Sequence, residues 1–192
     1  MSDGPPLDGQ GVIERLAELF AGPGAEDYLG ERVSQAQHMC QAGTLAEAAA
    51  APEALVAAAL LHDIGHFHGE VSGQDLMSGT DNRHSDTAAS WLGQWFPAEV
   101  TEPIRLHVAA KRYLCAVEPT YLARLSPASV YTLGVQGGPM DGDQVRAFEA
   151  EPFGDDAVAL RHWDDAAKDP EAVTHSFDHF RPLLGRLLVE AG

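Results

Sequence analysis

Residues 54–66, ALVAAALLHDIGH, decide the fold. Residues 54–61 are all apolar, and a helix without a polar face is buried on every side. The stretch therefore predicts a central core helix that begins after Pro52. His62 and Asp63 end this helix, and their burial would be costly unless hydrogen bonds or a metal ion satisfied both groups.

Helical patterns also flank this central element. Apolar residues form one stripe between Val12 and Phe20, and Gly22-Pro23-Gly24 then ends that helix. A second helix is expected from about Glu31 to Gln41, ending near Gly43. Further helices are expected over 84–96 and after Pro97, and later ones at Ser126, Asp141, Asp155 and Thr174. Because no stretch alternates as a strand does, the chain is predicted to be all-α, with a turn at 136–139 and a loop at 67–82.

The composition is that of a globular protein with a strong negative charge. A length of 192 residues predicts a single domain, 1–192, in which about the first eight residues are flexible. The formal net charge of −17 disfavours nucleic acid and anionic membranes as partners. With no apolar run of membrane-spanning length and no secretory signal, the chain is expected to be cytoplasmic. Cys40 and Cys115 are expected to be small buried hydrophobic residues.

The histidines and carboxylates suggest a shared metal site. A single His-Asp dipeptide is unremarkable in this composition, and a lone histidine on an apolar face is usually a hydrogen-bonded core residue. Six such groups beside apolar positions on separate predicted helices are harder to explain in that way, since facing helices can project ligands toward one point. These six are His38, His62, Asp63, His84, His107 and Asp164. They exceed what one structural zinc needs and include no thiolate, which suits two metals that share a carboxylate.

The other histidines differ in whether their positions allow them to reach this site. His66 follows His62 by four residues, so it can point toward the same site if the helix continues. The remaining ones are expected to be ordinary surface or core residues: His68, His162, His175 and His179.

The same residues resemble a known family. The spacing of His38, His62-Asp63 and Asp164 resembles the HD-domain superfamily, whose fold is a helical bundle and whose members are mostly metal-dependent phosphohydrolases. More specific strings resemble the HD-domain phosphonate oxygenases, which are mixed-valent di-iron enzymes that cleave carbon–phosphorus bonds. These strings are YLGE (28–31), HDIGH (62–66), HVAAKRYL (107–114), QGGPM (136–140) and WD (163–164).

The resemblance implies a cofactor and a reaction. The six residues above would bind two iron ions in the Fe²⁺/Fe³⁺ state, with Asp63 as the catalytic bridge between them, and O₂ would be the co-substrate. The substrate would be a small zwitterionic phosphonate, either 1-hydroxy-2-(trimethylammonio)ethylphosphonate or 1-hydroxy-2-aminoethylphosphonate. The products would be glycine betaine or glycine, together with phosphate. Ligand type alone does not distinguish iron from manganese or zinc.

Further residues have roles in substrate binding by the same resemblance. Lys111 lies four residues after His107 on the same predicted helix face, so its ammonium group can reach a phosphonate oxygen beside the metals. The resemblance adds three phosphonate contacts, at His66, Ser129 and Gln136. Tyr28 and Glu31 would form a catalytic latch that closes one metal position until substrate binds; without the resemblance they would be a core tyrosine and a helix-capping glutamate.

Two other functions fit the His-Asp core. A metal-dependent phosphohydrolase acting on a phosphoester or nucleotide would use a metal-bound hydroxide and would release phosphate without O₂. A non-catalytic HD-like binding module would retain its function when Asp63 is replaced by Ala. The phosphohydrolase does not account for the strings at 107–114 and 136–140.

Overall fold

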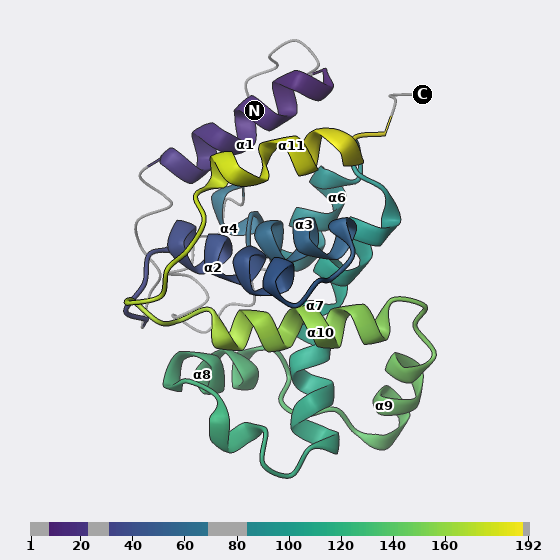
Figure 1. The fold of residues 1–192 in the computed structure, drawn as a ribbon. Helices are drawn as coiled ribbons and strands as arrows, with labels where there is room; N and C mark the ends of the chain where they lie inside the picture. The colour runs from purple at the N-terminus through teal and green to yellow at the C-terminus, as the bar shows by residue number, and fades with distance from the viewer. Residues whose placement is uncertain (1–7, 23–30, 69–83, 190–192) are drawn as a thin grey trace.

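The structure is a computed structural model that describes residues 8–22, 31–68 and 84–189. The side chains of His68 and His84 are outside this description, as are Tyr28, the first seven residues and most of the expected 67–82 loop. All the regular secondary structure in the described ranges is helical (Figure 1), which confirms the all-α prediction. In those ranges no helix is both long enough and apolar enough to cross a membrane.

The helices follow one another along the chain. They are α1 (Gly9–Ala21), α2 (Gln35–Ala48), α3 (Glu53–Leu61), α4 (Gly65–His68), α6 (His84–Leu92), α7 (Ala98–Val117), the short 3₁₀ helix η2 (Leu122–Arg124), α8 (Pro127–Val135), α9 (Gly142–Glu149), α10 (Gly154–Ala166) and α11 (Phe177–Leu187).

Helix α3 lies at the centre of the core, as its sequence predicts. Its side chains from Leu55 to Leu61 are buried, and it packs against α2, α7, α10 and α11. Figure 1 shows α1 and α11 side by side at one end of the molecule and α8 and α9 at the other, with α10 between them. His62 and Asp63, which follow the end of α3, are therefore buried inside the protein and not exposed at its surface.

Helix α2 differs from its predicted span at both ends. It begins after Ser34, whose hydroxyl accepts a hydrogen bond from the Gln37 N–H while the Gln37 side chain accepts one from the Ser34 N–H. It also continues through Gly43 to Ala48. A Cβ atom at Gly43 would lie 3.2 Å from the Leu60 Cβ and 3.3 Å from the Phe180 ring, so this glycine allows close packing of α3 and α11 and does not end the helix.

Several smaller predictions can also be compared with the structure. Ser126 caps α8 and Pro127 opens it, as expected. Helix α6 ends at Leu92 and not at Phe96, and α10 and α11 are capped at Phe153 and Ser176 and not at Asp155 and Thr174. Cys40 is buried as expected, but Cys115 is only partly buried.

Candidate metal centre

Four helices and one turn bring five of the six predicted metal ligands together inside the protein. His38 comes from α2, His107 from α7 and Asp164 from α10, while His62 ends α3 and Asp63 starts the turn into α4. All five are buried, with between 0% and 5% of their surface exposed. The sixth, His84, is the first residue of α6, which packs against α4 and α7 near this cluster.

Backbone carbonyls orient the rings of His38, His62 and His107. The Nδ1 atom of His38 lies 2.9 Å from the Ala167 oxygen, and that of His62 lies 2.9 Å from the Ala59 oxygen. The His107 Nδ1 lies 2.7 Å from the Ile104 oxygen. A carbonyl oxygen only accepts, so each Nδ1 carries a proton; in the neutral ring Nε2 then presents a lone pair, which is the arrangement found in metal-bound histidines.

The Nε2 atoms of His38 and His62 face each other at 3.1 Å. If both rings are neutral with the proton on Nδ1, the two Nε2 lone pairs oppose each other and form no hydrogen bond. Burial lowers the pKa of His62 and so favours its neutral form, although the neighbouring carboxylates act in the opposite direction. A cation between the two nitrogen atoms would remove the repulsion and use both lone pairs.

Two carboxylate oxygens lie beside these nitrogen atoms. The Asp63 Oδ2 atom is 3.8 Å from His38 Nε2 and 3.6 Å from His62 Nε2. The Asp164 Oδ1 atom is 3.4 Å and 3.9 Å from the same two nitrogen atoms. Neighbouring ligands on a metal with bonds of about 2.1 Å are about 3.0–3.4 Å apart. The donor atoms of His38, His62 and Asp63 all lie within 4.8 Å of one another and could hold one ion, with the Asp164 oxygen beside the two histidines.

The other oxygen of Asp63 faces a second group of nitrogen donors. Its Oδ1 atom is 3.6 Å from His107 Nε2 and 3.9 Å from His66 Nε2. The two oxygens of one carboxylate therefore face different histidines, as a bridge between two metal ions requires. The structure places His84 at the start of the adjoining helix but does not describe where its side chain points.

A buried cation balances Asp164. The Arg161 Nη1 atom is 2.7 Å from Asp164 Oδ2, the oxygen that faces away from His38. Burial alone would raise the pKa of Asp164, but Arg161 and the two histidines hold it well below the usual range. Arg161 also pairs with Asp165, and its Nε donates to the Tyr121 hydroxyl at 3.2 Å. Asp164 is thus ionised and oriented.

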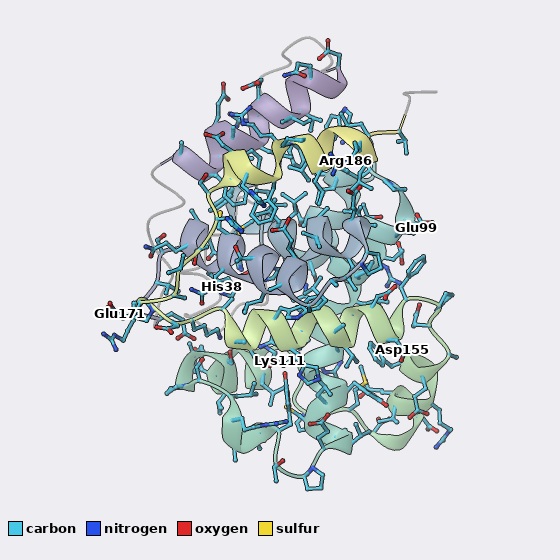
Figure 2. The ribbon with its side chains drawn as sticks, in the orientation of Figure 1. His38, Glu99, Lys111, Asp155, Glu171 and Arg186 are labelled. Carbon is cyan, nitrogen blue, oxygen red and sulfur yellow. The ribbon has the colours of Figure 1, made fainter. Side chains whose placement is uncertain are left out.

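Lys111 lies in the same interior region. Figure 2 shows Lys111 on α7 and His38 on α2, both close to α10. The lysine is 3% exposed, and its Nζ donates to Thr132 Oγ1 on α8 at 2.9 Å. Burial, followed by the positive charge of Arg161, lowers the pKa of Lys111 to about 7. With a pKa of about 7 the amine is only partly protonated near neutral pH, and an adjacent anionic ligand would favour its charged form.

Ser129 and Glu31 meet at a second lysine. The Lys168 Nζ lies 3.0 Å from Ser129 Oγ and 3.1 Å from Glu31 Oε1. Ser126, the cap of α8, donates its hydroxyl to the same Glu31 oxygen at 2.5 Å. The structure thus brings Glu31 and Ser129 together through a shared cation, while Tyr28 lies outside the described residues.

Gln136 occupies the turn after α8. Gly137 and Gly138 follow it with φ angles of +98° and +71°, which glycine adopts without strain, and Arg112 Nε donates to the Gly138 oxygen at 2.8 Å. Among the described residues, the Gln136 Oε1 is a buried oxygen with no hydrogen-bond partner. A rotation of this amide by 180° would present its two N–H donors at the same place.

Three residues near the centre were absent from the sequence-based set. Gln35 donates from Nε2 to Asp63 Oδ2 at 3.0 Å, and Arg161 and Lys168 have the contacts given above. Arg161 precedes Asp164 by three residues on one helix, so its spacing could have indicated a pair. Nothing local marks Gln35 or Lys168, whose partners are distant in the sequence.

A helical fold with a buried His, His-Asp and Asp cluster defines the class of metal-dependent HD proteins. The HD domain family matches residues 36–122. This range contains five of the six predicted ligands, namely His38, His62, Asp63, His84 and His107. That range ends before Asp164, which α10 supplies.

Comparison with curated proteins narrows this class. The chain is 44% identical over 178 residues to the [1-hydroxy-2-(trimethylamino)ethyl]phosphonate dioxygenase (glycine-betaine-forming) of Leisingera caerulea, covering 92% of this chain and 90% of that protein. It is 43% identical over 157 residues to the hydroxymethylphosphonate dioxygenase of Gimesia maris, covering 81% of this chain and 78% of the relative. The chain belongs to this family of HD-domain phosphonate dioxygenases. It is therefore an oxygenase, and its class uses a metal cofactor and O₂.

Proposed function

We propose that this enzyme uses O₂ to cleave the carbon–phosphorus bond of 1-hydroxy-2-(trimethylammonio)ethylphosphonate, giving glycine betaine and phosphate. The observation that carries the proposal is that the two carboxylate oxygens of Asp63 face separate groups of histidine nitrogens. The similarity to two phosphonate dioxygenases supports the reaction class.

The proposed cofactor is a pair of iron ions, one Fe²⁺ and one Fe³⁺. The donor set fits two such ions, because it consists of imidazole nitrogens and carboxylate oxygens that are held by backbone carbonyls and Arg161. The proposed ligands are His38, His62, Asp63, His84, His107 and Asp164. When bound, the iron pair supplies the activation of O₂ that an organic side chain cannot provide.

The phosphonate end of the substrate is assigned to the region around Lys111. A dianion in a chain of net charge −17 needs a local cation, and Lys111 is buried within reach of α8 and α10. Binding of the phosphonate would hold the proton on Lys111, since an adjacent anion favours the charged amine. We assign further phosphonate contacts to His66, Ser129 and the rotated amide of Gln136.

The cationic end of the substrate is assigned to the side of Tyr28 and Glu31. Glu31 already accepts from Lys168 and Ser126, so its charge is largely balanced before substrate arrives. A primary ammonium group would have to compete for these oxygens with its N–H donors. A trimethylammonium group has no such donors and needs only diffuse negative charge and aromatic faces, which favours it as the substituent.

The proposed reaction balances with O₂ alone as the oxidant. The C1–H and C1–P bonds break, C1 becomes a carboxylate, and phosphorus leaves as hydrogen phosphate with one proton released to water. Both atoms of O₂ enter the two products, and the substrate loses four electrons. The part of the protein residues is to orient the phosphonate, to compensate its charge and to exclude water from the reacting carbon.

The test compares three substrates on the iron-loaded enzyme while O₂ consumption and phosphate release are recorded together. We expect one phosphate per O₂, with kcat/KM highest for the trimethylammonio compound and lower for its amino and hydroxymethyl counterparts. Highest activity on the amino or hydroxymethyl compound would overturn the substrate assignment but keep the reaction. Phosphate release from a phosphoester under anaerobic conditions, without O₂-dependent turnover, would support a phosphohydrolase instead.

A further inference from the structure

A second group of potential metal ligands lies on the surface, away from the buried centre. The His179 Nε2 atom is 2.9 Å from Glu47 Oε2 and 3.1 Å from Glu47 Oε1. The His175 Nε2 atom is 3.6 Å from the same Oε2 oxygen. One donor atom from each of the three residues lies within 4.8 Å of the other two. Two imidazoles therefore converge on one carboxylate.

Ring contacts hold both imidazoles in place. They stack with their centroids 3.9 Å apart and an interplanar angle of 13°. Both meet the buried ring of Phe180 edge to face, with centroid distances of 4.9 Å for His179 and 6.2 Å for His175. Fixed rings lose less conformational entropy when they bind a ligand.

The backbone of His175 is tied to the helix that carries Glu47. Its N–H donates to Thr44 Oγ1 at 3.1 Å, and Thr44 in turn donates to the Cys40 carbonyl at 2.8 Å. Thr44 and Glu47 are three residues apart on α2 and so share one side of that helix. The segment that joins α10 to α11 is thereby held along α2, as Figure 1 shows.

The two imidazoles differ in their distance from the carboxylate. The His179 Nε2 atom is at hydrogen-bond distance from Glu47, whereas the His175 Nε2 atom is 3.6 Å from the same carboxylate, beyond that distance. A divalent cation satisfies both nitrogens and the carboxylate at once.

We propose that Glu47, His175 and His179 form a second metal site, which takes a divalent transition metal of the Zn²⁺ class. Two imidazole nitrogens and one carboxylate are a ligand set that zinc commonly accepts, with water at the remaining position. The three side chains are 40–50% exposed, so the metal and its water have direct access. Glu47 lies nine residues after His38 on α2, or about 13 Å along the helix, which separates this site from the buried cluster.

Occupation of this site would clamp the segment that supports the buried centre. The segment includes Ala167, whose carbonyl oxygen orients His38, and Asp169, whose N–H and carbonyl group bind the Gln41 side chain. A metal ion that joins α2 to residues 175 and 179 would stabilise the folded protein by an amount that grows with the ratio of free metal concentration to Kd. This inference does not depend on the reaction that the enzyme catalyses.

The test is a Zn²⁺ titration of the iron-loaded enzyme by isothermal titration calorimetry, with bound zinc and retained iron measured after dialysis. Three chains are compared: wild type, the double variant H175A/H179A, and H162A as a control that removes an exposed histidine on α10. The E47Q variant keeps a hydrogen-bond acceptor for His179 but weakens the metal ligand.

We expect wild type and H162A to bind one more Zn²⁺ per chain than H175A/H179A, beyond any zinc that replaces iron. E47Q should bind that ion at least tenfold more weakly, and zinc should raise the melting temperature of wild type but not of the double variant. Equal excess zinc in wild type and the double variant, or unchanged affinity in E47Q, would overturn the proposal. If the double variant fails to fold, E47Q alone decides the outcome.

Discussion

The Lys111→Met substitution should make the protein more stable and less active at the same time. Lys111 is 3% exposed, and its pKa falls from 10.5 to about 7 in the folded protein. At 1.36 kcal/mol per pH unit, this corresponds to a penalty of up to about 5 kcal/mol for holding the charged amine in the core. Methionine fills a similar volume without that penalty.

The stability gain should depend on pH with a definite sign. Below pH 7 both the folded and the unfolded chain carry the protonated lysine, so the full penalty is present. Between pH 7 and 10.5 the unfolded chain binds the proton that the folded chain has lost, so the wild type gains stability as the pH rises. K111M should therefore be more stable than wild type at pH 6, and the difference should vanish by about pH 10.

Activity should change in the opposite direction. The lost charge-assisted contact to the phosphonate is worth about 1.5–3 kcal/mol, or about a 10- to 150-fold fall in kcat/KM. Urea unfolding at pH 6 and pH 10 on samples of equal iron content, together with O₂ consumption, measures both effects. Arg146→Met removes an exposed cation and serves as the control. A K111M protein that is less stable than wild type at pH 6 would refute the reasoning.

Three other substitutions test the surroundings of the metals. Asp63→Ala should abolish turnover and lower the iron content below two ions per chain, because this one side chain faces both metal positions. Metal analysis of the variant and of the exposed-site control Asp155→Ala checks this. An unchanged iron content in Asp63→Ala would count against a bridging role. Gln35→Leu removes the hydrogen bond to Asp63 and should weaken iron binding about 10- to 100-fold in a chelator competition, whereas wild-type affinity would show that the contact is dispensable. Arg161→Met removes the buried cation that pairs with Asp164 and should lower the free energy of unfolding of the metal-free protein by about 3–5 kcal/mol. A change below about 1 kcal/mol in urea would contradict this prediction.

The helical fold could be predicted because local chemistry agrees with the tertiary structure in the central elements. The apolar stretch before His62 admits only a buried helix, and the structure places α3 there. The ends of α2 were harder to predict. Ser34 and Gln37 form a capping box that a local pattern does contain, but Gly43 is needed for contacts with Leu60 and Phe180, which only the packed structure reveals.

The residues of the candidate site also fall into those that the sequence could predict and those that it could not. Five residues selected by type and position converge in the structure, because a polar residue beside apolar positions has to face some buried partner. Gln35 and Lys168 could not be selected, since their significance lies in contacts with Asp63 and with Glu31 across the fold. His175 was expected to be ordinary for the same reason: its neighbours on α2 are far away in the sequence.

The most direct test of two metals sharing Asp63 is a crystal structure of the iron-loaded enzyme with anomalous scattering recorded at the iron edge. We predict two peaks, one near His38 and His62 and the other near His107, separated by about 3.5–4 Å across the Asp63 carboxylate. A single peak, or two peaks of which one lies outside the reach of Asp63, would contradict the account.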